Sequence, residues 1–180
     1  MKRSVMHASA MLAAAFALSG IVATPAVAAA PTQSCTKVTG TATFAPGLTN
    51  TAKNNTVTAK GTETGCTPAA ATGGSGTLTA TIKLTLGSCN KLSTGGQKLV
   101  GTAASTWKNK KVSKYSLTFT TGTGAAITTA TISGKVSSGL FAGKKIAGQV
   151  KFKIVGAPDC SNAKPIKNVT FTGSKPFVIS

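Results

Sequence analysis

Acidic residues and histidine are scarce in this sequence. Its 180 residues contain two acids, Glu63 and Asp159, and one histidine, His7, which falls in an N-terminal segment predicted to be removed. Proton-transfer catalysis needs a group that titrates near neutrality, most often histidine or a tuned carboxyl. A two-carboxylate glycosidase needs its acids within roughly 5–9.5 Å, whereas these two acids are expected at opposite rims of the fold. The shortage predicts that the protein is not an enzyme.

Arginine is equally scarce, since Arg3 is the only one and lies in the same N-terminal segment. Sequence-specific nucleic-acid recognition favours bidentate guanidinium contacts, so its absence argues against specific nucleic-acid binding. The four cysteines show no C-x-x-C spacing and have no histidine beside them, which argues against a metal site. The sequence implies no cofactor.

Three short motifs resemble catalytic or phosphate-binding signatures. Ser88–Lys91 and Ser161–Lys164 match S-x-x-K, but both follow cysteines in expected loops instead of opening a buried helix. Residues 139–145 resemble a phosphate-binding loop, with three residues between the glycines where four are needed. We interpret all three as chance matches. A hydrolase with an unrecognised site stays as the minor alternative.

The N-terminus has the pattern of a secretory signal peptide. Met1-Lys2-Arg3 is basic, an apolar run covers about residues 8–23, and Thr24-Pro25-Ala26-Val27-Ala28 ends in an A-x-A pattern. We predict cleavage after Ala28, giving a signal peptide over residues 1–28 and a single all-β domain over 29–180. No later run is apolar for long enough to span a bilayer. The protein is expected to be secreted, free or associated with the cell wall.

The remaining chain is dominated by alternating apolar and polar residues. In Gly76–Leu86, leucine, isoleucine and alanine alternate without exception with threonine and lysine, which predicts a strand with one buried face. The same pattern predicts eight strands, near residues 36–44, 55–65, 76–86, 97–107, 112–121, 126–136, 145–155 and 166–178. Gly- and Pro-rich segments such as Ala45-Pro46-Gly47 are expected as the turns between them. These features predict an all-β, antiparallel, closed or nearly closed barrel, with an immunoglobulin-like sandwich as the alternative.

An even cysteine count in an exported chain predicts two disulfides. If neighbouring strands are antiparallel, Cys35 at the start of the first strand and Cys66 at the end of the second lie at one rim. Cys89 and Cys160 follow the third and seventh strands and so lie at the opposite rim. The predicted pairs are therefore Cys35–Cys66 and Cys89–Cys160.

Lysine is the one charged residue in abundance. Formal charge is +18 for the whole sequence and +16 once Lys2 and Arg3 leave with the signal peptide. One predicted hairpin tip concentrates this charge, because the single tryptophan and the single tyrosine flank four lysines there: Trp107, Lys108, Lys110, Lys111, Lys114 and Tyr115. This cluster predicts adhesion to anionic polymers such as cell-wall phosphate polymers. The competing interpretation is that lysines keep the protein soluble and that both rings pack in the core at the barrel mouth.

Two further functions fit an alternating strand pattern. A carrier could hold a small apolar ligand inside the barrel, since several inward positions are small: Gly61, Ala80, Gly101, Ala103 and Gly148. An enclosed apolar cavity of roughly 300 Å³ or more would favour this carrier. A membrane barrel would instead place the threonine and lysine face in its lumen, where most of the lysines would repel one another.

Several segments resemble a family of small exported actinobacterial proteins: Thr39–Leu48, Thr64-Gly65-Cys66, Ser88-Cys89, Trp107 and residues 134–143. The resemblance covers nearly all of the chain after the signal peptide and rests on turn glycines, cysteines and strand residues. It implies a small, β-rich, two-disulfide secreted protein. It implies no activity, and therefore transfers no functional residue.

Overall fold

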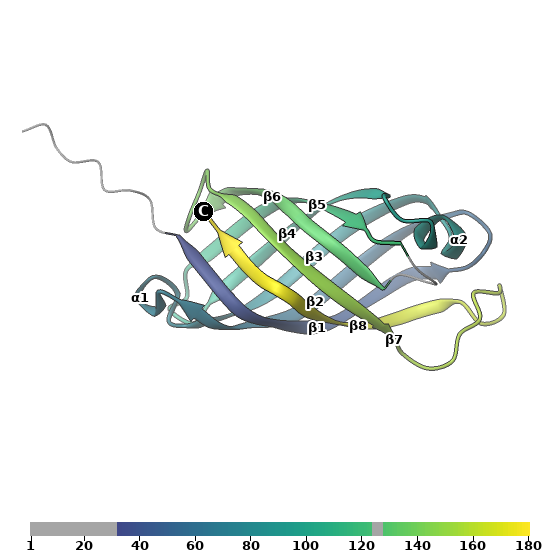
Figure 1. Cartoon of the computed structure of the whole chain (residues 1–180), viewed down its shortest axis with the longest axis horizontal. Coiled ribbons are helices and arrows are strands. Elements are labelled where there is room, and N and C mark those ends of the chain that lie inside the picture. Colours follow the sequence, from purple (N-terminus) through teal and green to yellow (C-terminus); the bar gives the residue numbers. More distant parts are fainter. Residues whose placement is uncertain (1–31, 124–127) are drawn as a thin grey trace, which may run out of the picture.

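The alternating segments form a closed antiparallel barrel of eight strands, in which each strand pairs with the next along the chain and β8 pairs with β1 (Figure 1). The computed structural model describes residues 32–123 and 128–180. Its strands are β1 (Gln33–Leu48), β2 (Lys53–Thr67), β3 (Ser75–Gly87), β4 (Lys98–Trp107), β5 (Val112–Thr121), β6 (Thr129–Gly139), β7 (Lys145–Ile154) and β8 (Ile166–Ile179). The predicted closed barrel is confirmed, and the sandwich alternative is wrong. The predicted signal peptide and the first residues of the predicted sixth strand lie outside the described residues.

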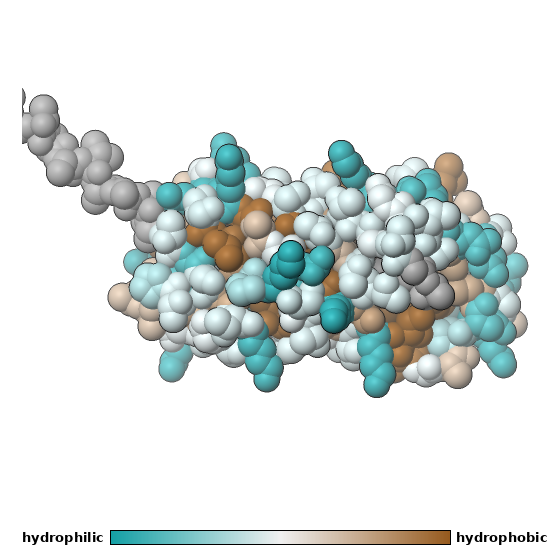
Figure 2. Space-filling view, viewed as in Figure 1, coloured by the Kyte–Doolittle hydropathy of each residue, from teal (hydrophilic) through white to brown (hydrophobic). Residues whose placement is uncertain are grey.

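Because side chains of a strand point alternately to its two sides, the apolar and polar residues of each strand lie on opposite faces of the barrel wall. In β3, Ile82 and Leu84 are buried while Thr81 and Lys83 are exposed. The apolar residues of all eight strands therefore fill the interior, and threonine, serine and lysine cover the outside. This orientation is opposite to the one that a membrane barrel would require. Figure 2 shows the result on one face, where hydrophilic side chains stand out from a mostly neutral surface with small hydrophobic areas.

Two single-turn helices lie at opposite ends of the barrel, α1 (Ala69–Thr72) and α2 (Cys89–Ser93) (Figure 1). Neither was predicted, because one turn is too short for a 3.6-residue period to appear in the sequence. The loop expected at Ser88–Lys91 is wrong, because Ser88 opens α2 and caps it by accepting a hydrogen bond from the backbone N–H of Lys91. None of the helices in the described residues is long and apolar enough to cross a membrane.

Both predicted disulfides are confirmed. Cys35 is joined to Cys66 at the α1 end, and Cys89 is joined to Cys160 at the α2 end. The second bond ties α2 to the connection between β7 and β8. Two disulfides in a chain of this size are consistent with an extracellular location.

The turn predicted at residues 45–47 is wrong. Ala45-Pro46-Gly47 lies within β1, which continues to Leu48, and the chain reverses over residues 49–52. The pairing of β1 with β8 shifts register between Thr43 and Leu48, so the Pro-Gly pair marks an irregularity inside a strand. Proline and glycine are tolerated at such irregular positions because one regular ladder bond is already absent there.

Candidate functional site

The predicted lysine cluster occupies the β4–β5 hairpin tip. Lys108, Lys110 and Lys111 form the turn, and the exposed side chain of Lys114 leaves the outer face of β5. The turn is packed against the α1 end of the barrel: the amide of Asn109 donates to the carbonyl of Ala71 at 2.7 Å, and its oxygen accepts from the N–H of Lys111 at 3.2 Å. Three of the four ammonium groups are therefore presented by an anchored turn, and the fourth by the strand that follows it.

The two rings of the predicted site face the interior. Trp107 and Tyr115 are each 1% exposed, so neither offers a ring face to a sugar or a polymer. The ring of Trp107 packs edge-on to Phe141, and the ring of Tyr115 packs edge-on to Phe177, with centroids 6.1 Å apart in both pairs. Core packing at the barrel mouth is thus the correct interpretation of these two residues, and the surface cluster consists of lysines.

Other lysines surround the barrel. Lys145, Lys151 and Lys153 are all exposed on β7, as their shared parity predicts. A shallow hollow of about 310 Å³ lies on the outer face of β3 to β5, and Lys114 is its one charged lining residue. Hydroxyl groups supply most of the remaining polar lining, from Thr79, Thr81, Thr102, Ser116 and Ser137. The outer surface therefore offers ammonium and hydroxyl groups and almost no carboxylate.

Glu63 is the main feature that the sequence analysis missed. Its carboxyl is fully buried in β2, and among the described residues neither oxygen has a hydrogen-bond partner. Burial raises the pKa of Glu63 to about 7, and the nearby hydroxyl of Ser105 opposes the shift. The ring of Trp107 covers it on one side, where Gly76 leaves room: a Cβ there would lie 2.8 Å from the indole and 3.3 Å from Glu63 Oε2.

Three more buried polar groups gather in this half of the barrel. The hydroxyl of Tyr115, the hydroxyl of Ser105 and the amide of Gln33 have no hydrogen-bond partner among the described residues. Burial and then the nearby Glu63 carboxyl raise the pKa of Tyr115 above its usual range. Because the side chain of Glu63 is fully buried, its carboxyl does not face a substrate in the solvent.

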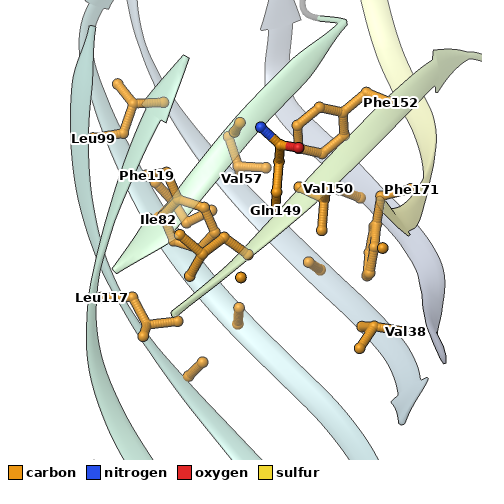
Figure 3. Close-up of a pocket in the computed structure, with 18 of the residues that line it drawn as sticks. Val38, Val57, Ile82, Leu99, Leu117, Phe119, Gln149, Val150, Phe152 and Phe171 are labelled. Carbon is orange, nitrogen blue, oxygen red and sulfur yellow. The ribbon is translucent and has the colours of Figure 1, made fainter. Parts of the chain in front are cut away.

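The other half of the barrel contains an apolar cavity of about 90 Å³ (Figure 3). All eight strands contribute to its wall, and Leu92 of α2 closes it from one end. Figure 3 shows Val38, Val57, Ile82, Leu117 and Phe119 among the side chains that surround this space. The volume is well below the roughly 300 Å³ that would favour the carrier predicted from the sequence, so that size criterion is not met and only a small ligand would fit.

No group of three or more histidine, cysteine or acidic residues that could hold a metal is present in residues 32–123 and 128–180. No family model, no curated protein and no solved structure matches this chain. It is a small β-barrel protein with two disulfides, and its resemblance to exported actinobacterial proteins stays a prediction.

Proposed function

We propose that this protein is a non-catalytic extracellular protein that adheres to anionic polymers through its lysines, with the β4–β5 tip as the strongest contact. The observation that carries the proposal is the imbalance of surface charge. Of the two acids, Glu63 is buried, which leaves Asp159 as the acidic side chain that faces solvent. Of the 18 lysines after the predicted signal peptide, all are exposed except Lys144, which is half-buried.

The β4–β5 tip should contribute more to adhesion than the other lysines because its charges are close together. At physiological ionic strength the Debye length is about 8 Å, so isolated surface charges act weakly while clustered ones act together. The turn is held in place by Asn109, which lowers the ordering cost when a polymer binds. Lysine is a mobile point charge, so adhesion should be weakly selective among polyanions and strongly dependent on salt.

The test compares two variants with the same loss of charge. One replaces Lys108, Lys110, Lys111 and Lys114 by glutamine, and its control replaces four exposed lysines on separate strands, Lys37, Lys60, Lys83 and Lys167. Retention on immobilised heparin and on a teichoic-acid polymer is measured as the salt concentration at elution. The tip variant should elute at the lower salt. Equal elution of the two variants would mean that the tip is not a site and that the charge serves solubility.

A second function is favoured by the interior cavity. We propose that the barrel also carries a small apolar ligand, because an interior space lined almost wholly by apolar side chains gains little from filling with water. The two functions use different surfaces and are tested separately.

A further inference from the structure

The cavity exists because one row of inward positions consists of alanines. Ala42 pairs with Ala59, Ala59 with Ala80, and Ala80 with Ala103, so four neighbouring strands place a methyl group in one row of paired positions. All four residues line the cavity. An eight-stranded barrel is just wide enough to be filled by ordinary side chains, and a row of alanines therefore leaves space.

The wall beside the alanine row is irregular along one segment of β8, which pairs with β1. Between Gly173 and Pro176, β8 is out of register with β7 on one side and with β1 on the other. Pro176 has no N–H to donate. We call the part of the wall formed by Gly148, Gln149 and Gly173–Pro176 the β7–β8 seam.

Residues of the seam belong both to the cavity lining and to the outer surface. Gly148, Gln149, Gly173 and Lys175 all line the cavity, and Lys175 is also exposed. Figure 3 labels Gln149 as the polar side chain among the apolar ones, beside Val150 on β7. The two glycines have no side chain to thicken the wall, and around Gly173 the nearest atoms to an added Cβ are 3.5 Å away. A molecule bound here would have an apolar interior on one side and a cation at the mouth.

We propose that the cavity and the β7–β8 seam form a binding site for a small carboxylic acid, with its short apolar chain along the alanine row and its carboxylate at the mouth beside Lys175. This inference rests on the carrier function proposed above and names its ligand class. An anion is favoured because neither acid of the barrel, Glu63 or Asp159, lines the cavity. Since a cavity of about 150 Å³ accepts benzene, a space of 90 Å³ suits a chain of about four carbons.

The experiment follows alanine methyl groups by NMR in the protein with both disulfides intact. The probes are xenon, straight-chain carboxylates from propanoate to heptanoate, pentanol and pentylammonium. Methyl signals of Ala59, Ala80 and Ala103 should shift, while that of the outward Ala104 serves as the control. Affinity should rise about fourfold with each added methylene until the chain fills the cavity, and then level off.

The head-group preference is tested with Lys175→Gln and its control Lys151→Gln, which removes an equal charge from an exposed position outside the cavity lining. Lys175→Gln should weaken pentanoate about three- to fivefold and leave pentanol unchanged, whereas Lys151→Gln should change neither. If the two variants bind pentanoate equally, or if pentanol and pentylammonium bind as tightly as pentanoate, the inference is overturned while the carrier function stands. If no probe, xenon included, shifts the three inward methyls, both are overturned.

Discussion

The indole N–H of Trp107 donates a hydrogen bond of 2.8 Å to the hydroxyl of Ser113, inside the barrel wall. The hydroxyl of Ser113 in turn donates a hydrogen bond of 2.6 Å to the backbone carbonyl of Leu140. The tip that carries the lysine cluster is thus fixed from within, because its first aromatic residue is bonded across the hairpin. Trp107 is buried, so it can stabilise the hairpin that carries the lysine cluster but cannot contact a polymer bound to those lysines.

Ser113→Ala should destabilise the protein by about 1–3 kcal/mol, because it leaves a buried indole N–H and a carbonyl without their partner. The control is Ser116→Ala on the same strand, whose exposed hydroxyl faces outward and whose loss should stay within about 0.5 kcal/mol. Urea unfolding followed by tryptophan fluorescence measures both. Equal stability of the two variants would show that the Trp107–Ser113 bond contributes nothing.

Glu63 should make stability depend on pH between about 4.5 and 7. The folded protein keeps the proton up to a pKa of about 7, whereas the unfolded chain loses it near 4.5. The contribution of Glu63 is therefore fully present below pH 4.5, falls as pH rises, and is lost above pH 7. The total loss should be about 3 kcal/mol.

Glu63→Gln is the variant that tests this dependence, because the amide has nearly the same shape and does not titrate. Its stability should match that of the unmodified protein below pH 4.5 and exceed it above pH 7. Asp159→Asn is the control: hydrogen bonds from Ser161 hold the pKa of Asp159 below its usual range, outside the window. Parallel pH profiles for the Gln variant and the unmodified protein would show that Glu63 titrates normally.

Removing the Cys89–Cys160 disulfide by a double alanine substitution should cost about 4 kcal/mol, since it releases a chain segment of 71 residues in the unfolded state. Cys35 and Cys66 are separated by 31 residues, so the same change there releases a shorter loop. On chain entropy alone, its cost should be smaller than that at Cys89–Cys160, by less than about 1 kcal/mol. Urea unfolding of both variants gives the comparison. A loss below about 1 kcal/mol at Cys89–Cys160 would contradict the expected role of the larger loop.

Much of this architecture was predictable because an antiparallel barrel obeys simple parity. Alternation located all eight strands to within a few residues, and the parity of strand ends gave both disulfide pairs. The same rule could have found Glu63. Gly61 is predicted on the inner face of β2, and Glu63 follows at the next inward position. Burying a carboxylate is unfavourable, but a pKa raised to about 7 lets Glu63 be neutral inside the barrel below that pH.

The cavity and the seam could not be predicted in the same way. Small inward residues such as Ala80 are compatible either with space or with closer packing of the opposite wall, and only the assembled barrel distinguishes the two. The register shifts around Gly173 depend on pairing with both β7 and β1, which lie far away in the sequence. Local alternation contains no information on such long-range irregularity.

Two glycines of the barrel interior should respond in opposite ways to an added methyl group. A Cβ on Gly40 would press into the carbonyl oxygen of Lys60 and lie 2.5 Å from Phe171 Cζ, so the backbone itself would have to move. Gly40→Ala should therefore destabilise the barrel by about 1–3 kcal/mol or more. At Gly173 the added Cβ would make ordinary contacts at 3.5 Å, and the loss of unfolded-state freedom should leave Gly173→Ala neutral or more stable by about 0.4–1 kcal/mol. Thermal and urea unfolding of the two variants decides the matter, and a destabilised Gly173→Ala protein would mean that the seam is packed as tightly as the rest of the wall.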